Sequence, residues 1–313
     1  RMGNEVHVFT RMGEGQAWYE VVDGVHYHRC PFNLNPDFVT EIHNMCSSLA
    51  HHFFETENVS GGFDIVHAHD WLTVPALAEV KNAKNKKAVF TIHSTEYGRC
   101  GNNFFDGQSK RIQELEWYGG YISDRVITVS HKMKEEIMWI YHIPDWKIAV
   151  IYNGVNLRRF DGYIDPGAVK MRWGIGPLDP TCLFVGRMVH QKGPDLLLEA
   201  IPSVLSEFPA AKFVFVGDGY LRESLEHRAW ELGISHACRF LGHISEWDLI
   251  DLYRACDTVC VPSRNEPFGI VILEAWAAGK PVIVTHNGFD FVWHDVNGLK
   301  VYDNPNSITW GIK

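Results

Sequence analysis

Short apolar segments alternate along this chain with longer segments in which apolar residues recur at helical spacing. In the first half, the strand-like segments are 5–10, 64–70, 87–93, 125–130 and 147–154, and the helical ones are 37–54, 73–83, 109–123 and 131–141. In the second half, the strand-like segments are 181–187, 211–219, 238–243, 257–263 and 281–286, and the helical ones are 194–207, 220–232, 246–255 and 269–278. Strands that alternate with helices favour parallel sheets with right-handed crossovers. The pattern therefore predicts an α/β fold.

A stretch rich in Gly, Pro and Asp separates the two series of strands and helices. With 313 residues, the chain is long enough for two domains. We predict two doubly wound, Rossmann-like domains, at residues 1–153 and 181–313, joined by a linker at 154–180. Their facing strand ends would form a cleft. The first residue is Arg1 rather than an initiator Met, so we expect the chain to begin part-way through its first domain.

Composition narrows the possible classes of function. The chain is 46% hydrophobic and 21% charged, as globular proteins are, and its formal net charge of −9 argues against nucleic-acid binding. No apolar run approaches the roughly 18 residues that span a bilayer, so we expect no transmembrane segment. The seven cysteines form no C-x-x-C pair, which suggests a reducing compartment, and we expect a cytoplasmic protein. Seventeen histidines are present, but no pair shows a recognised zinc spacing, and we expect no metal site.

Polar residues follow several strands of the second half at the points where those strands end. Arg187 ends one strand and Lys192 comes five positions later, whereas Asp218, Glu266 and His286 follow three others. Each alone could be a solvated loop residue. In doubly wound sheets, however, ligands bind outside the carboxyl ends of the strands. The sequence therefore predicts a binding site at this edge, with Gly186 and Gly217 beside it.

The stretch "SRNEPFGIVILEAWAAG" (263–279) adds the start of a helix to this edge. Its first N–H groups, those of Phe268, Gly269 and Ile270, have no partner within the helix and can bind phosphate. Glycine at 269 allows close approach of the backbone. Arg187 and Lys192 supply two cations for the same anion.

Glu274 lies one helical turn beyond Ile270, on the same face of the helix. A carboxylate there can accept two hydrogen bonds from a vicinal diol such as a ribose. The alternative is a buried glutamate paired with an arginine, but no nearby arginine is evident in the sequence. A site that binds phosphate groups and, next to them, a diol suits a nucleoside diphosphate, which we predict as the ligand.

These segments resemble a known family over nearly the whole chain. "EPFGIVILE" is similar to the E-x7-E motif of the family 4 glycosyltransferases and the related starch and glycogen synthases, which have the two-domain GT-B fold. "VGRMVHQKG" resembles the family's G-R-x-x-x-x-K-G segment, and "VGDG", "YNGVNLRRF" and "VITVS" match in order and spacing. "HAHDWLT" (67–73), "TIHSTEYGR" (91–99) and "GGYISDRVITVS" resemble segments of glycogen synthases in particular.

The resemblance implies roles for individual residues. Arg187 and Lys192 would hold the diphosphate of the donor, Glu274 its ribose and Glu266 its sugar, and His93 would lie at the reacting centre. Asp70 and Trp71 follow another strand end, where sugar contact and helix capping are equally open.

The resemblance also implies the reaction. It predicts retaining transfer of a hexosyl group, glucose from UDP-glucose or ADP-glucose, to a glycan or other hydroxyl acceptor. Preorganised cations can replace a metal ion in this chemistry, and the chain has no D-x-D pair, so we expect no metal requirement and no cofactor.

The chain departs from the family pattern at three places. The family's first strand and Gly-rich loop would precede Arg1, its closing helix would continue beyond Lys313, and only Gly288 stands where the family has a Gly-Gly pair. Three hypotheses therefore remain open. The protein extends an α-glucan; it glycosylates a lipid, a phosphorylated sugar or a small metabolite; or it binds nucleotide sugar without turnover.

Overall fold

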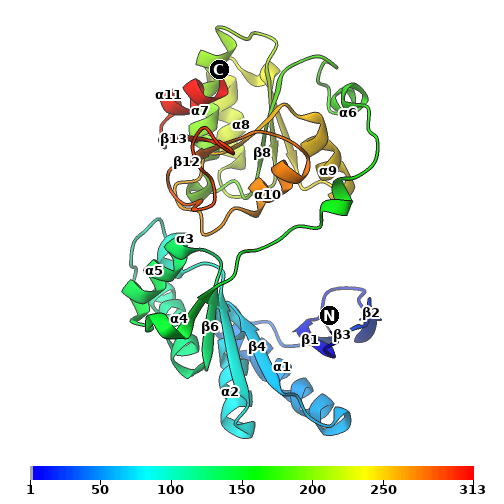
Figure 1. The fold of residues 1–313 in the computed structure, drawn as a ribbon, viewed down its shortest axis with the longest axis vertical. Helices are drawn as coiled ribbons and strands as arrows, with labels where there is room; N and C mark the ends of the chain where they lie inside the picture. The colour runs from blue at the N-terminus through cyan, green and yellow to red at the C-terminus, as the bar shows by residue number, and fades with distance from the viewer. Residues whose placement is uncertain (1–2) are drawn as a thin grey trace. The chain divides into compact units, whose positions relative to one another are not determined.

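The computed structural model describes residues 3–313, so Arg1 and Met2, at the start of the predicted first domain, lie outside the described residues. The chain divides into two compact units (Figure 1). One contains Arg1–Tyr97 and Asn103–Ile151, and the other contains Gly98–Asn102 and Tyr152–Lys313. The segment expected to be a linker thus belongs to the second unit, where it forms the short helices η3 (Leu157–Phe160) and α6 (Pro166–Arg172).

The second unit is built on a six-stranded sheet in which every neighbouring pair is parallel. Its strand order is β10-β9-β8-β11-β12-β13. The strands are β8 (Thr181–Val185), β9 (Lys212–Val216), β10 (Cys238–Gly242), β11 (Thr258–Val261), β12 (Val282–Thr285) and β13 (Leu299–Val301). The order reverses between β8 and β11, which makes their carboxyl ends the topological switch point where such sheets bind ligands.

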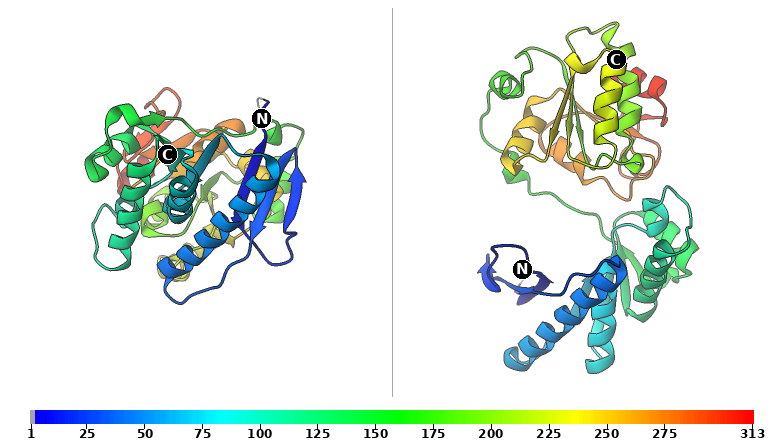
Figure 2. Two further views of the ribbon diagram at one scale, coloured as in Figure 1. Left: turned by 90° about the horizontal axis from the view of Figure 1, so that it is seen from below. Right: turned by 180° about the vertical axis from the view of Figure 1, so that it is seen from behind.

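Helices cover both faces of this sheet (Figures 1 and 2). Residues on alternate positions of β9 show why: Phe213 and Phe215 belong to one buried cluster, and Val214 and Val216 belong to another. Strands buried on both faces must be apolar throughout. The first cluster packs against α7 (Pro194–Leu205), α8 (Arg222–Glu231) and α11 (Pro305–Ile312), and the second against α6, α9 (Glu246–Ala255) and α10 (Ile270–Ala277). Short helices η4 (His190–Lys192) and η5 (Ser235–Ala237) lie in the connections.

The first unit contains a four-stranded parallel sheet whose strands follow one another in chain order. They are β4 (Ile65–His69), β5 (Lys87–Ile92), β6 (Arg125–Thr128) and β7 (Ile148–Val150). The helices are α1 (Phe38–Ser60), α2 (Val74–Lys84), α3 (Glu96–Arg99), α4 (Gln108–Ile122), α5 (His131–Tyr141), η1 (Trp71–Thr73) and η2 (Asp145–Lys147). The α/β class and the parallel sheets predicted from the sequence are confirmed.

The N-terminal strands form a separate three-stranded sheet. β1 (Val6–Arg11) pairs in parallel with β3 (Val25–Cys30), and β3 pairs antiparallel with β2 (Tyr19–Val22). The turn between β2 and β3 is Asp23-Gly24, with φ values of 50° and 69°. Two consecutive left-handed residues are the signature of a tight hairpin turn. The sequence analysis placed a strand at 5–10 but did not predict this hairpin.

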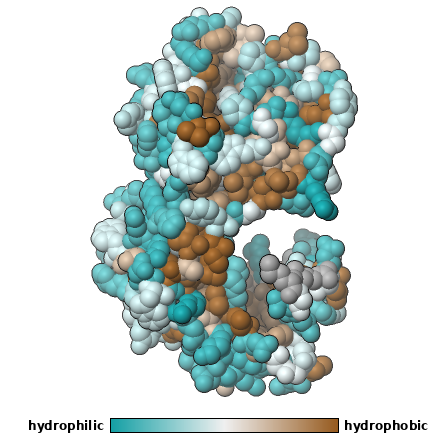
Figure 3. All heavy atoms as spheres, in the orientation of Figure 1, coloured by the Kyte–Doolittle hydropathy of each residue, from teal (hydrophilic) through white to brown (hydrophobic). Residues whose placement is uncertain are grey.

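β1 and β4 are both edge strands, and a cavity of about 430 Å³ is lined by residues of both. In the space-filling view, hydrophobic side chains gather on the part of the four-stranded sheet next to the N-terminal sheet (Figure 3). Ile65 on β4 is among the exposed apolar residues. Within residues 3–313, no helix combines the length and apolar character needed to cross a membrane.

Candidate active site

The loops that follow β8 and β9 pack backbone against backbone. The N–H of Gly186 donates to the carbonyl of Val216 (3.0 Å), and the N–H of Met188 donates to the carbonyl of Asp218 (2.8 Å). A side chain at Gly217, whose φ is 121°, would collide with the Gly186 carbonyl oxygen. Gly217 is therefore required at the floor of the switch point, because the Gly186 backbone leaves no room for a Cβ there, whereas Gly186 contributes its backbone N–H and carbonyl to this packing.

Arg187 begins the loop after β8, and its side chain is exposed. Among residues 3–313, we find no hydrogen bond or ion pair made by its guanidinium. A guanidinium with several unused N–H donors at a switch point is suited to bind an anion through bidentate hydrogen bonds.

Lys192 and Glu266, singled out separately from the sequence, contact each other. The Lys192 ammonium lies 2.7 Å from Oε2 of Glu266, and the Ser263 hydroxyl donates to the same oxygen at 3.0 Å. Glu266 is only 6% exposed. A buried carboxylate needs such a partner, and the pairing holds the ammonium at the edge of the site with its other protons available.

A second ion pair fixes the loop that carries Lys192. The guanidinium of Arg264 contacts both carboxylate oxygens of Asp195 (2.8 and 2.5 Å) and donates to the carbonyl of His190 (2.8 Å). Burial alone would raise the pKa of Asp195, but the hydrogen bonds and charge of Arg264 together lower it. The sequence analysis missed this pair. Its partners are 69 positions apart, and no local spacing signals their contact.

The start of α10 presents unused N–H groups. Its N-cap, Gly269, has a φ of 90°, and no side chain caps the helix. A Cβ at Gly269 would collide with the ring of Phe289, so the packing itself requires glycine. Phe268 is buried before the helix, whereas Ile270 is half exposed. α10 therefore begins where the sequence predicts, and the anion site at its N-terminus stays a prediction.

The loop after β12 packs on Glu266. A Cβ at Gly288, with φ 138°, would collide with the Glu266 carbonyl oxygen. Phe289 follows with a φ of 62°, although it is not glycine, and its ring is buried. The chain therefore adopts two consecutive left-handed residues at Gly288 and Phe289.

Glu274 lies half-buried in α10 and has a partner that the sequence did not reveal. Its Oε2 accepts a hydrogen bond from the hydroxyl of Tyr253 (2.8 Å), which is itself buried on α9. Burial raises the pKa of Glu274, while the Tyr253 hydrogen bond and the charge of Arg159 act in the opposite direction. Tyr253 thus orients the carboxylate and occupies one of its two oxygens.

Asp218 and His286 are engaged in local contacts. Oδ1 of Asp218 accepts from the N–H of Gly219 (2.8 Å), and Oδ2 lies 3.5 Å from Arg222. The ring of His286 lies 5.0 Å from that of Tyr302. Both residues thus stabilise loops at the carboxyl edge.

In the first unit, three histidines gather at the ends of β4 and β5. Nδ1 of His69 lies 3.0 Å from Nε2 of His93, and Nε2 of His67 lies 2.7 Å from the hydroxyl of Thr91. Burial, with smaller contributions from His69 and His93, lowers the pKa of His67 to about 4. Burial and His93 also lower the pKa of His69. The predicted reacting-centre residue, His93, is therefore held by a neighbouring neutral imidazole.

Asp70 links two strand ends, whereas Trp71 is part of the hydrophobic core. The Asp70 carboxylate accepts the backbone N–H of His93 (2.8 Å) and makes no capping bond to η1, so it ties the end of β4 to the end of β5. Asp70 has a φ of 55°, an uncommon conformation for a residue other than glycine. The Trp71 ring is buried in the core, against Phe38.

At the switch point of the second unit, a free guanidinium, a lysine, open helix N–H groups and a carboxylate come from the loops after β8 and β11 and from α10. Comparisons with known proteins agree with this chemistry. Residues 1–159 match Glycosyltransferase Family 4, and residues 170–313 match Glycosyl transferases group 1. The chain belongs to the family 4 glycosyltransferases.

Relatives of this glycosyltransferase include proteins with different assigned activities. An uncharacterised glycosyltransferase of Methanocaldococcus jannaschii is 40% identical over 320 residues, covering 100% of this chain and 80% of the relative. The glycogen synthase of Mycobacterium tuberculosis is 32% identical over 225 residues, covering 72% of this chain and 52% of the relative. A D-inositol 3-phosphate glycosyltransferase of Corynebacterium urealyticum is 29% identical over 311 residues, covering 92% and 72%.

Solved structures share the fold. Sucrose-phosphate synthase of Thermosynechococcus elongatus superimposes with a TM-score of 0.81 at 22% identity, covering 99% of this chain and 79% of the other. HepE of Anabaena, solved with UDP and glucose, gives a TM-score of 0.76 at 20% identity, covering 91% and 75%. The GT-B fold predicted from the sequence is thereby confirmed.

Proposed function

We propose that this glycosyltransferase moves a glucosyl group from a nucleoside diphosphate sugar to a glycan, with retention of configuration. The observation that carries the proposal is the set of groups that the second unit's switch point supplies: Arg187 and Lys192 come from the loop after β8, and the uncapped α10 starts there with Glu274 one turn further along. Two cations, free N–H groups and a carboxylate complement a diphosphate and a ribose diol.

The chemistry follows from where charge develops. As the bond between the anomeric carbon and the β-phosphate oxygen breaks, negative charge grows on that oxygen. Arg187, Lys192 and the α10 N–H groups are aimed at this charge before the reaction begins, and such preorganised donors lower the barrier. The acceptor oxygen forms the new bond on the same face of the sugar, and its proton passes to the departing phosphate. In this scheme the protein's cations act in place of a metal ion.

Glu266 and His93 are the proposed contacts to the sugar. Glu266 is buried, and its charge is balanced by Lys192. Its carboxylate can therefore accept a hydrogen bond from a sugar hydroxyl without being an isolated buried charge. His93 is a hydrogen-bonding group steadied by His69 and by Asp70.

Support for glucose and for a nucleotide donor comes from similar proteins. HepE has been solved with UDP-glucose, and starch synthase IV of Arabidopsis thaliana has been solved with ADP and acarbose. The similarity to glycogen synthase favours a glucan acceptor. A small phosphorylated acceptor is the second candidate, because D-inositol 3-phosphate glycosyltransferases resemble this chain over a larger share of its length.

A panel of nucleotide sugars and acceptors tests the proposal. UDP-glucose, ADP-glucose and other UDP-hexoses are each combined with glycogen, maltooligosaccharides or inositol phosphate, and released nucleoside diphosphate is measured. We expect release only with a glucosyl donor, stimulated by one acceptor class, and an α-linked product by NMR. A β-linked product contradicts retention. Release with another sugar contradicts the proposed donor.

A further inference from the structure

The parallel pairing of β1 with β3 gathers metal-ligating residues on one face of the N-terminal sheet. Side chains two apart on a strand point to the same face, so Glu5 and His7 lie together, as do His26 and His28. The register places His7 directly opposite His26. The E-x-H segment of β1 and the H-x-H segment of β3 form one cluster only because the two strands pair. Local spacing in the sequence does not reveal it.

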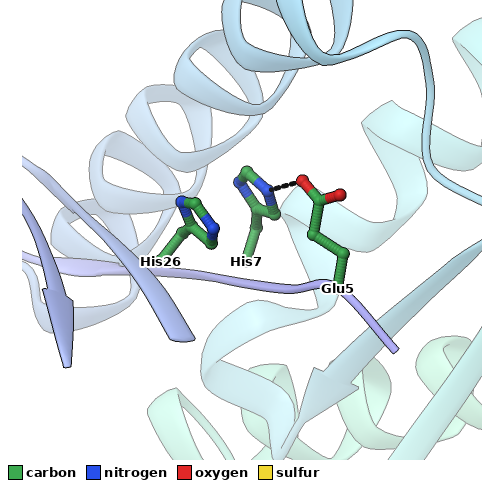
Figure 4. Close-up of side chains that lie close together, drawn as sticks. All are labelled: Glu5, His7 and His26. Atoms are coloured by element: carbon green, nitrogen blue, oxygen red, sulfur yellow. Dashed lines mark hydrogen bonds and ion pairs between the residues drawn. The ribbon is translucent and has the colours of Figure 1, made fainter. Parts of the chain in front are cut away.

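The three residues Glu5, His7 and His26 converge closely enough to share one ion (Figure 4). Nε2 of His7 lies 2.9 Å from the Glu5 carboxylate, and the rings of His7 and His26 stack 4.4 Å apart with only 4° between their planes. One ligand atom from each of the three residues lies within 4.8 Å of the others. Bringing these atoms to tetrahedral spacing around a metal requires rotation of the side chains.

Hydrogen bonds to Nδ1 orient the imidazoles of both His7 and His26. Nδ1 of His7 lies 2.9 Å from Nε2 of His28, and Nδ1 of His26 lies 2.6 Å from the hydroxyl of Tyr19. This leaves Nε2 as the ligand nitrogen of each ring. Metal-binding histidines commonly have their second nitrogen held in this way, since the bond fixes the tautomer and the ring direction.

A simple His–Glu ion pair does not account for the whole cluster. An ion pair needs only Glu5 and a protonated His7, whereas here a second and a third imidazole lie against the first. One carboxylate and two imidazoles from two paired strands thus form a candidate set of metal ligands.

We propose that Glu5, His7 and His26 bind one Zn²⁺ ion, with water as the fourth ligand, and that His28 and Tyr19 position the two imidazoles. Two imidazoles and a carboxylate are a donor set that zinc prefers. The His7 side chain is nearly buried whereas Glu5 is exposed, so the ion enters from solvent on the Glu5 side. The site joins β1 to β3 and so stabilises the N-terminal sheet.

Zinc titration of the chelator-treated protein tests this site. A chromogenic chelator competes for Zn²⁺ with the wild-type chain and with the Glu5→Gln, His26→Gln and His51→Gln variants. His51 is the matched control, because it also faces a glutamate, Glu55, but on the exposed side of α1. We expect one zinc per chain in the wild type and in His51→Gln, and at least 10-fold weaker binding in the other two variants. Zinc should raise the Tm of the wild type but not that of His26→Gln.

Co²⁺ substitution reports the coordination geometry of the site directly. We expect the strong visible absorption of four-coordinate cobalt in the wild type and its loss in Glu5→Gln, whose substitution is on an exposed side chain. If His26→Gln does not fold, Glu5→Gln decides alone. Absence of saturable one-to-one binding, or equal zinc affinity in Glu5→Gln and wild type, overturns the site.

Discussion

At the scale of single residues, the two acids of the E-x7-E motif differ in their surroundings. Glu266 is buried against Lys192 and Ser263, whereas Glu274 is half-buried and accepts from Tyr253. The sequence predicted both acids and their roles, but neither partner. Tyr253 lies on a different helix, and Lys192 follows a different strand. Local spacing identifies residues that share an element, while contacts across elements depend on the fold.

These surroundings predict separate effects of substitution. Glu274→Gln should weaken binding of both free UDP and UDP-glucose by about 10-fold or more, the loss expected for a hydrogen bond to a charged group. Glu266→Gln should leave free-UDP affinity nearly unchanged and reduce sugar transfer. Calorimetric titration with both ligands measures the difference. Equal losses of UDP affinity in the two variants would contradict the assignment.

The histidine cluster predicts a pH dependence of stability. The pKa of His67 is about 4 in the folded chain, against 6.5 for an ordinary histidine. The unfolded chain therefore binds more protons between these values, so this contribution is full above pH 6.5 and is lost as the pH falls toward 4. The His67→Gln variant keeps a polar side chain near Thr91, but that side chain does not bind a proton in this pH range.

Urea unfolding of wild type and His67→Gln across this range measures the effect. We expect the wild-type-minus-variant difference in unfolding free energy to be constant above pH 7 and to decrease between pH 6.5 and 4. A difference that stays constant throughout would show that His67 titrates as it does in the unfolded chain.

At the scale of elements, the second unit's strands β8 to β12 were predicted from their apolar runs, whereas the short strand β13 and the helices α6 and α11 were not. The central strands β8 and β11 are buried on both faces and are largely apolar, whereas the edge strands β10 and β13 contain Arg239 and Lys300. The N-terminal hairpin was harder to predict from the sequence, since β2 is largely exposed and its apolar pattern is weak. The Asp23-Gly24 turn was the available signal. The Arg264–Asp195 pair had no such signal.

The packing of the β8 and β9 loops predicts which glycines cannot be replaced. Gly217→Ala should cost roughly 2–5 kcal/mol, because it combines left-handed strain with a collision against the Gly186 carbonyl. Gly233 also has a positive φ, of 70°, but open space around it. Gly233→Ala should therefore cost only about 1–2 kcal/mol. Urea unfolding of the two variants compares them, and equal losses would contradict close packing of the two loops.

At the scale of the whole molecule, alternation of strands and helices predicted parallel sheets, whereas strand order required the structure. The reversal between β8 and β11 is what brings Arg187, Lys192 and Glu266 to one point, although they span about 80 positions of sequence. Chain order alone does not reveal which strands are neighbours, because crossover connections can move either way along the sheet.

The central claim is that this switch point binds the diphosphate of a nucleotide sugar. Calorimetric titration of UDP and ADP into wild type, Lys192→Ala and Lys280→Ala tests it most directly. Lys280 precedes β12, at the opposite end of the strands, and serves as the matched control. We predict one-to-one binding to wild type and Lys280→Ala, weakened by about 1.5–3 kcal/mol in Lys192→Ala. Equal affinity in all three proteins, or no binding to the wild type, would contradict the account.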